Sequence, residues 1–132
     1  MPNNELIPFK EHANRVTATP SAAVTGKRFV SISGDRQPDG TYTVAPTGAA
    51  GKALGVAAWD AGVGSKVTVV TITSGDIVPV RAGAALTANA SVMSDATGQA
   101  VVATAGATGL GIALTGCASG ADAQILLTRH SV

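Results

Sequence analysis

Side chains that could carry out chemistry are sparse in this sequence of 132 residues. The two histidines, His12 and His130, lie near the chain ends, and neither has a second His, Cys or carboxylate at a metal-ligand spacing. No Gly-x-Ser-x-Gly nucleophile elbow is present. The aspartates fall almost entirely in predicted turns, where Asp bonds nearby backbone amides: Asp35, Asp39, Asp60, Asp76, Asp95 and Asp122. We therefore predict no catalytic site, no metal and no cofactor.

The glycine-rich segments contain no phosphate-binding loop. Residues 48–53 have the wrong spacing for Gly-x-x-x-x-Gly-Lys-Ser/Thr, and in 25–29 Arg28 stands where the Mg²⁺-binding hydroxyl belongs. The segment TSGDIVPVRAG (73–83) is loosely similar to trimeric all-β enzymes that hydrolyse dUTP, but their phosphate-binding and nucleoside-binding segments are missing. A trimeric nucleotide hydrolase is thus the least favoured function, and we predict that the chain is not an enzyme.

The composition indicates a protein whose surface is covered by neighbours. Charged residues make up 13% and aromatic residues 3% of the chain, whereas a typical soluble domain is about 25% charged. A chain so poor in charge gains stability when it buries surface against copies of itself or a partner. The net charge is only +1, and no Lys/Arg cluster is interleaved with aromatic residues. We therefore expect no nucleic acid partner.

The sequence gives no indication of a signal peptide or a membrane helix. Residues 1–15 carry charges throughout and lack the apolar core of a signal peptide. Residues 96–121 hold no charged residue, but their glycines and hydroxyl side chains make them too weakly apolar to span a membrane. Cys117 is the only cysteine, and we expect it to pack as a small apolar residue. These features predict a soluble protein assembled in the cytoplasm.

Short runs rich in Val, Ile and Thr, several of them alternating in period two, predict β-strands. These runs, separated by turn signals, are 27–33, 41–46, 66–73, 76–81, 99–103 and 123–128. Pro79 lies inside one run and predicts an edge strand or a bulge. At most one short helical turn fits, over 48–54 or 104–109. We therefore predict an all-β fold, a small barrel or sandwich.

One stretch of the chain occurs twice at an offset of 56 residues. ALGVAAWDAGVGSKVTVV (53–70) matches LGIALTGCASGADAQILL (110–127), with Gly64 on Gly120, whereas Trp59 falls on Thr115. One small β-unit cannot bury its apolar face alone, and a second copy supplies the complementary face. We therefore predict a single β domain over 25–132 that is built from two similar units, about 25–73 and 81–128.

Residues 1–24 differ from the rest because they hold three prolines and few periodic apolar positions. We predict an extended N-terminal arm here. Leu6, Ile7 and Phe9 form an apolar cluster that could dock the arm on a neighbouring subunit or partner, although a frayed terminus is an equal alternative.

The repeated layout of Leu-Gly-Val/Ile-Ala, an Ala-x-x-Gly turn and a Val/Ile/Leu strand resembles the capsid decoration (cement) proteins of tailed phages over about residues 25–128. The resemblance implies a β-barrel-like domain that forms homotrimers on the outer capsid surface of the virion. Its partner would be the major capsid protein, and the shell would be stabilised. Leu6, Ile7, Phe9 and Trp59 are the predicted contact residues. The alternative is a carbohydrate- or host-surface-binding module of a phage fibre, for which Trp59 and Tyr42 offer stacking surfaces.

Overall fold

The computed structural model describes residues 4, 6 and 13–132. It contains ten strands: β1 (Arg15–Pro20), β2 (Phe29–Ile32), β3 (Tyr42–Pro46), β4 (Gly55–Ala57), β5 (Val67–Thr71), β6 (Ile77–Arg81), β7 (Ser91–Ser94), β8 (Ala100–Val102), β9 (Thr108–Ala113) and β10 (Asp122–Ser131). The predicted all-β fold is confirmed. No helix occurs in the described part of the chain, which agrees with the prediction of at most one short helical turn over 48–54 or 104–109. Nor does this part hold a helix able to cross a membrane.

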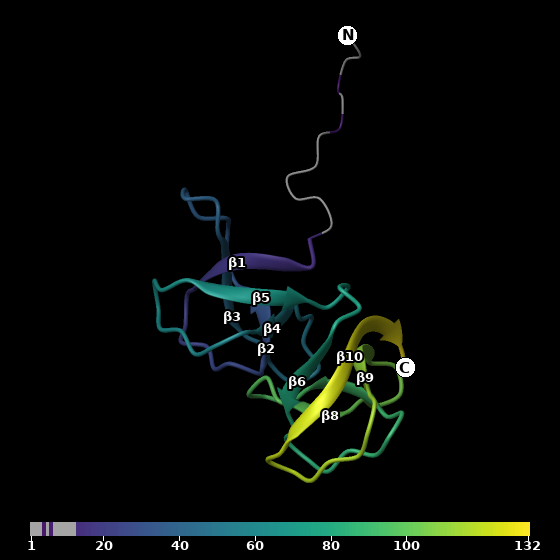
Figure 1. The fold of residues 1–132 in the computed structure, drawn as a ribbon. Coiled ribbons are helices and arrows are strands. Elements are labelled where there is room, and N and C mark those ends of the chain that lie inside the picture. Colours follow the sequence, from purple (N-terminus) through teal and green to yellow (C-terminus); the bar gives the residue numbers. More distant parts are fainter. Residues whose placement is uncertain (1–3, 5, 7–12) are drawn as a thin grey trace.

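The first five strands form a closed barrel in the order β1-β3-β2-β4-β5 (Figure 1). Parallel pairing of β1 with β3 closes it, and β1 also pairs antiparallel with β5. Small side chains fill the interior, where Ala18, Val44 and Val67 are fully buried. We call residues 15–71 the closed unit. The prediction of an extended arm over 1–24 is therefore wrong for its last part, because β1 is an integral barrel strand whose alternate residues bury their side chains.

The last five strands repeat this cyclic order as β6-β10-β9-β7-β8, and we call residues 77–131 the open unit. Here one parallel bridge joins Ala82, directly after β6, to Ala100 of β8, where the closed unit has a ladder of three residue pairs. The strand β8 has three residues, whereas its counterpart β3 has five. The open unit is therefore a curved sheet whose first and last strands lie close together at one point.

Two offsets relate the units. From β4 to β9 and from β5 to β10 the offset is 56, as between Gly55 and Gly111. From β1 to β6 and from β2 to β7 it is 62, as between Phe29 and Ser91. The difference of six arises because the chain runs 23 residues from Ile32 to Gly55 but 17 from Ser94 to Gly111. The units therefore begin earlier than residues 25 and 81, where sequence matching placed them.

The backbone conformation repeats as well. Lys27 and Asn89, related by the offset of 62, both have positive φ, at 64° and 70°. Gly64 and Gly120, related by the offset of 56, both have φ of 83°. A positive φ is unfavourable for a side chain such as that of Lys27, and the same conformation at equivalent places indicates that the turns, not only the strands, are duplicated.

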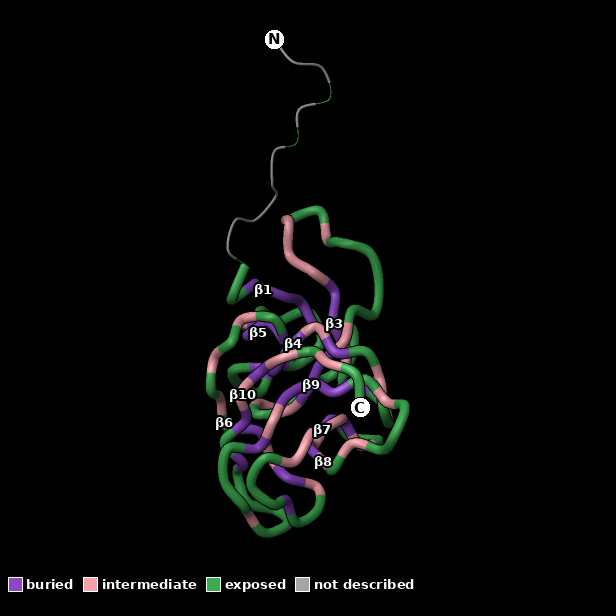
Figure 2. Tube along the Cα trace, turned by 90° about the vertical axis from the view of Figure 1, so that its right-hand side faces the viewer, coloured by how far each residue is buried: buried purple, intermediate pink, exposed green. Residues whose placement is uncertain are grey.

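The two units share one apolar core. Phe29, Val56 and Val70 of the closed unit belong to the same cluster as Val80, Leu110, Ile125 and Leu127 of the open unit. Backbone hydrogen bonds cross the boundary, because Phe29 N–H donates to Gly98 O and Arg81 N–H donates to Lys27 O, each at 2.8 Å. Figure 2 shows buried segments running through both units, with exposed loops at the periphery.

Strand β6 lies at the edge of the open sheet, which confirms the prediction made from Pro79. The edge strand pairs only with β10, where Pro79 stands opposite Gln124. Leu127 N–H donates to Asp76 O at 3.0 Å, and in this register the nitrogen of Pro79 faces the free edge. Proline has no N–H to donate there, so the edge cannot accept a further strand in a continuous ladder.

Candidate functional site

The loop over residues 58–66, which joins β4 to β5, presents apolar side chains on its exposed side. Trp59 is 51% exposed and Val63 is 69% exposed. The indole Nε1 of Trp59 donates to Lys66 O at 3.1 Å, which fixes the ring. A Cβ at Gly26 would lie 2.9 Å from Trp59 Cα, so this close approach requires glycine. We call this segment the barrel loop; it holds Trp59 and Val63 toward solvent in a fixed geometry.

An ion pair ties the base of the barrel loop to the turn between β2 and β3, which projects from the barrel (Figure 2). Lys66 Nζ lies 2.8 Å from Asp39 Oδ2 and donates to Thr19 Oγ1 at 3.0 Å. The Lys66 ammonium, with the N–H and hydroxyl of Thr41, holds the pKa of Asp39 well below its usual range. Asp39 is therefore ionised at neutral pH. Because the pair is exposed, it orients the loop more than it stabilises the fold.

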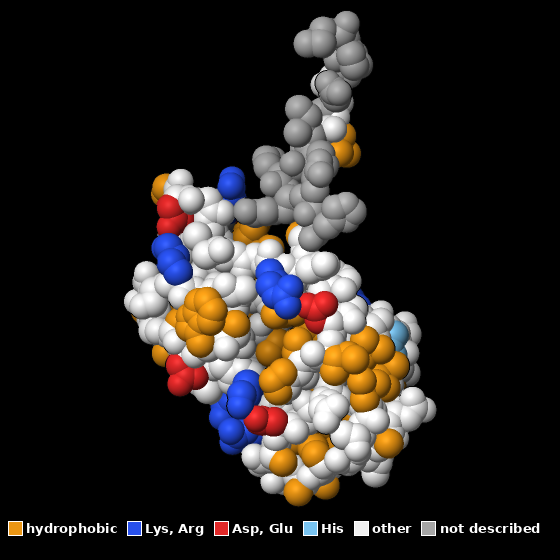
Figure 3. Space-filling model, in the orientation of Figure 1, with side chains coloured by type: hydrophobic (Ala, Val, Ile, Leu, Met, Phe, Trp, Pro, Cys, Tyr) orange, Lys and Arg blue, Asp and Glu red, His pale blue; other side chains and the backbone are white. Residues whose placement is uncertain are grey.

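A second apolar surface, which we call the apolar face, lies on the outer side of β6, β10 and β9. It consists of Ile77, Pro79, Ile112, Leu114 and Leu126. Ile77 is 60% exposed and Leu114 is 43% exposed. Side chains alternate along a strand, and Ile125 and Leu127 on either side of Leu126 are buried, so Leu126 faces outward. Figure 3 shows hydrophobic side chains gathered over these strands, beside the histidine. Contiguous apolar surface of this kind is typical of a contact site.

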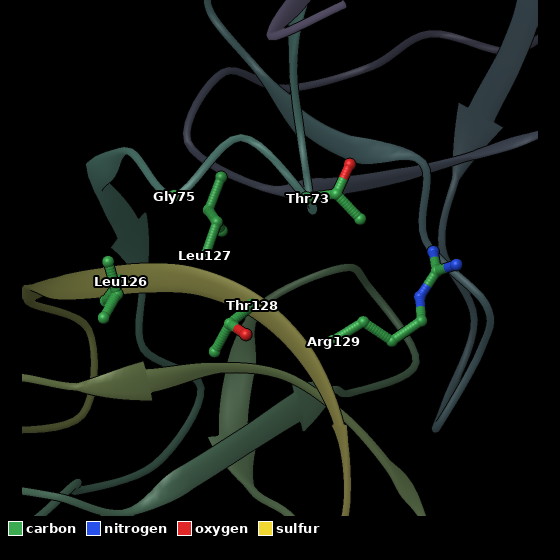
Figure 4. Close-up of a pocket in the computed structure, with 6 residues that line it drawn as sticks. All are labelled: Thr73, Gly75, Leu126, Leu127, Thr128 and Arg129. Atoms are coloured by element: carbon green, nitrogen blue, oxygen red, sulfur yellow. The ribbon is translucent and has the colours of Figure 1, made fainter. Parts of the chain in front are cut away.

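A hollow of about 350 Å³ lies beside the apolar face, between the turn that joins the units and the end of β10 (Figure 4). Its lining residues are Thr73, Gly75, Leu126, Leu127, Thr128 and Arg129. The Arg129 side chain extends toward the closed unit, where Nη2 donates to Ala53 O at 2.8 Å. The lining offers hydroxyls, aliphatic groups and the Arg129 guanidinium but no carboxylate, thiol or imidazole, so the hollow lacks the usual groups for acid–base or nucleophilic chemistry.

The remaining candidates for chemistry have structural partners. His130 Nε2 lies 2.9 Å from Ser91 Oγ, and Nδ1 lies 3.1 Å from Thr128 O. Cys117 is half-buried and packs against the shared core. His12 lies outside the described residues. Among the residues that the structure describes, no three His, Cys, Asp or Glu side chains gather closely enough to hold a metal ion.

The aspartates mostly serve turns and ion pairs. Asp95 accepts hydrogen bonds from the backbone N–H groups of Thr97 and Gln99, at 2.8 and 2.9 Å. Asp76 Oδ2 lies 3.2 Å from Arg15 Nη2, so the aspartate of the hydrolase-like segment is paired with a cation.

Asp122 joins the two units. Its Oδ2 lies 2.7 Å from Lys27 Nζ of the closed unit, and its Oδ1 lies 3.2 Å from Arg81 Nε of the open unit. The hydrogen bond from Lys27 is the main cause that lowers the pKa of Asp122; desolvation opposes it, and Arg81 adds to the lowering.

The structure describes two of the four predicted contact residues, Leu6 and Trp59. Leu6 is 83% exposed, and Trp59 is half-exposed in the barrel loop. Ile7 and Phe9 lie outside the described residues, so the apolar cluster of the arm stays a prediction. Tyr42 is half-buried and packs against the barrel core, which makes it a poor stacking platform for a sugar.

The apolar face was not predicted from the sequence. Its residues come from β6, from β10 and from β9 with the position that follows it, and β9 was not among the predicted strands. The available signal was the repeat: Ile112 and Leu126 stand at an offset of 56 from Val56 and Val70, which pair on the outside of the closed unit. Only the pairing register shows that these positions are neighbours.

Comparison with known proteins places this geometry in a phage context. The family model described as phage cement protein matches residues 10–129, which include all of both units except the last two residues of β10. The N base of the head fiber protein gp8.5 of bacteriophage phi29 has a similar solved structure. Its TM-score is 0.72 at 19% identity, over 89% of this chain and 96% of that chain. This likeness concerns the fold, and no curated protein matches the chain.

The family match spans far more than half of the chain, and the decoration-protein resemblance of its repeated motifs agrees with it. This is a phage structural protein, and the chain belongs to the phage cement protein family.

Proposed function

We propose that this protein binds the outer surface of a phage head as a homotrimer and stabilises the shell, with the major capsid protein as its partner. The observation that carries the proposal is the family match across both β-units. A subunit that binds only the assembled shell stabilises it by mass action. Three linked copies bind several capsid sites at once, which raises the overall affinity without new kinds of contact.

The two exposed apolar surfaces support the proposal. A protein with 13% charged residues presents the barrel loop at one place and the apolar face at another, so it has separate surfaces for the shell and for its own copies. The solved neighbour is the base of a head fiber, and we infer a comparable place at a head surface for this chain. The half-exposed Trp59 is our candidate anchor, because tryptophan is enriched among residues that dominate binding energies.

The test is binding to phage shells that lack the protein. Purified protein is mixed with such shells, and occupancy is measured by co-sedimentation, together with the temperature at which the shells break. We expect saturable binding and more heat-resistant shells. Trp59→Ala should weaken binding at least about tenfold. Thr115→Ala, at the equivalent position of the open unit, is the matched control and should bind as wild type. Absence of saturable binding by the wild-type protein would refute the proposal.

The predicted arm needs a separate variant that spares β1. Thr71 N–H donates to Asn14 O at 2.9 Å, and the Thr71 hydroxyl donates to Ala13 O at 2.8 Å. A truncation must therefore end at residue 12. We expect this truncation to leave the melting temperature nearly unchanged and to lower shell occupancy, because it removes Leu6, Ile7 and Phe9. Normal occupancy after truncation would assign the contact to the barrel loop alone.

A further inference from the structure

One row of residues crosses the outside of the closed unit and is covered by the open unit. Phe29 of β2 pairs with Val56 of β4, which pairs with Val70 of β5, which pairs with Arg15 of β1. The three apolar members are buried, with exposures of 0, 3 and 8% for Phe29, Val56 and Val70. They belong to the cluster that holds the inner side chains of the open unit, so the apolar row of the first unit packs into the second.

The same row exists in the open unit, but no further unit covers it among the residues that the structure describes. Ser91 of β7 pairs with Ile112 of β9, which pairs with Leu126 of β10, which pairs with Ile77 of β6. Ile77 replaces Arg15 and is 60% exposed, while Ile112 and Leu126 are half-buried. This row keeps its apolar character although none of the described residues covers it.

The row of residues next to this one also carries larger apolar side chains in the open unit than in the closed unit. In the closed unit it consists of small or polar residues, Thr17 and Thr68 followed by Ala58. In the open unit Pro79 replaces Thr17 and Leu114, which is 43% exposed, stands at the position of Ala58. Between them lies Gln124, an exposed polar residue at the position of Thr68, so this row is apolar only at its two ends. The apolar surface of the open unit is therefore wider than one row, and it is exposed where its counterpart in the closed unit is polar.

The geometry favours contact through the face of the sheet rather than along its edge. Pro79 presents no N–H at the free edge of β6, and the N–H of Arg81 on that edge is already bonded to Lys27 O at 2.8 Å. A partner strand would leave unpaired backbone groups there, which is unfavourable. The side chains of the apolar face remain available.

The charges around the apolar face fit a second copy of the same chain. Identical copies bring like charges together, so a surface for self-association should have its charges compensated. Asp76 at one end of β6 is paired with Arg15, and at the other end Asp122 is paired with Lys27 and Arg81. The five residues of the face itself are uncharged. Neither aspartate leaves an uncompensated acid, and Arg129, at the hollow beside the face, donates to Ala53 O at 2.8 Å.

We propose that the apolar face of Ile77, Pro79, Ile112, Leu114 and Leu126 is the surface through which copies of this chain associate. The inference rests on the homotrimer of the proposed function and adds the surface that forms it. It assigns the apolar face to contacts between copies and leaves the barrel loop for the shell. Another copy would cover this row with an outer surface, because the inner side chains of its open unit already pack against its own closed unit.

The test is the mass of the full chain in solution, measured by sedimentation and light scattering over a range of concentrations. Ile77→Glu places a charge on the exposed end of the row and should raise the concentration at which the oligomer dissociates at least about tenfold, or about 1.4 kcal/mol. Val63→Glu, equally exposed but on the barrel loop, should leave the mass unchanged. Melting curves followed by circular dichroism verify that both variants are folded, and Leu114→Glu provides a second disruption of the face.

Three outcomes would overturn the inference: a wild-type monomer at all concentrations, oligomers of Ile77→Glu and Leu114→Glu as stable as wild type, or dissociation caused by Val63→Glu alone. Loss of shell binding by Ile77→Glu with its oligomer intact would assign the face to the capsid. The inference would then fail while the proposed function stands. Conversely, an oligomer that depends on Ile77 but does not bind shells would retain the inference and refute the proposed function.

Discussion

The closed and the open unit have the same five strands in the same cyclic order, yet only one of them closes. In the closed unit β1 and β3 are joined by three parallel residue pairs, whereas in the open unit one bridge, from Ala82 to Ala100, joins the ends of the sheet. The open unit therefore keeps its inner side chains accessible on one side, and the outer row of the closed unit, with Phe29 fully buried, occupies that side. Because the open unit does not close, the two units can pack around one shared core.

The units also differ in what they present to the outside. The barrel loop of the closed unit holds Trp59, where the open unit has Thr115. The outer row of the open unit ends in Ile77, where the closed unit has Arg15. Each unit has thus acquired an exposed apolar residue where the other is polar, and the duplicated scaffold presents two different contact surfaces.

The largest effect should follow from removing the side chain that joins the units. Phe29→Ala leaves a cavity in the shared core and should lower the free energy of unfolding by about 3–5 kcal/mol. Ser91→Ala, at the equivalent position of the open unit, should change it by less than about 1 kcal/mol. Urea titration followed by fluorescence of Trp59 and by circular dichroism measures both variants. A Phe29→Ala protein that unfolds in two separate transitions would show that the units are independently stable.

A smaller difference should separate two equivalent glycines. A Cβ at Gly55 would overlap the backbone oxygen of Val70, whereas a Cβ at Gly111 would lie 2.5 Å from the Ile125 side chain and 2.7 Å from the backbone oxygen of Leu126. Gly55→Ala should destabilise the protein by about 3 kcal/mol or more, and Gly111→Ala by less, because its backbone overlap is smaller and the Ile125 side chain can shift. Thermal melting of both variants provides the comparison, and equal losses would contradict this explanation.

The smallest effect concerns the exposed ion pairs between the units. Lys27 and Arg81 lower the pKa of Asp122 in the folded protein. The stabilisation is therefore present above the unfolded pKa of about 3.9 and is lost as the pH falls below it. Asp122→Asn should be slightly less stable than wild type near neutral pH, and the difference should shrink at acidic pH as the pH falls below the unfolded pKa and through the lowered folded pKa. Urea midpoints at neutral and acidic pH measure this, and a pH-independent difference would rule out the ion pairs as its source.

Sequence patterns indicated the strands that carry β-branched residues but not those built from small ones. Runs such as 67–71 and 77–81 were predicted within a few residues. The strands at 55–57, 91–94 and 108–113 were missed, because Gly, Ala and Ser have little intrinsic strand preference and form strands here through tertiary pairing. β1 was assigned to the arm for a related reason: Pro20 ends it, and proline was taken as a sign against regular structure.

The contact surfaces were predictable to different degrees. Trp59 stood out because aromatic residues are rare in this chain and because its repeat position holds Thr115. The apolar face could not be found in this way, because Ile77 is related to Arg15 by an offset of 62 and Leu126 to Val70 by an offset of 56. The loops that change the offset lie between the two segments, and only the register across β6, β10 and β9 brings the residues together.

The most direct test of this account is a cryo-electron microscopy reconstruction of shells decorated with the wild-type protein. The account predicts density on the outer surface of the shell in clusters of three copies. In each cluster the apolar face around Leu126 should lie between copies, and the barrel loop with Trp59 should contact the capsid. Isolated single subunits, or subunits whose apolar face lies on the shell or remains open to solvent, would contradict it.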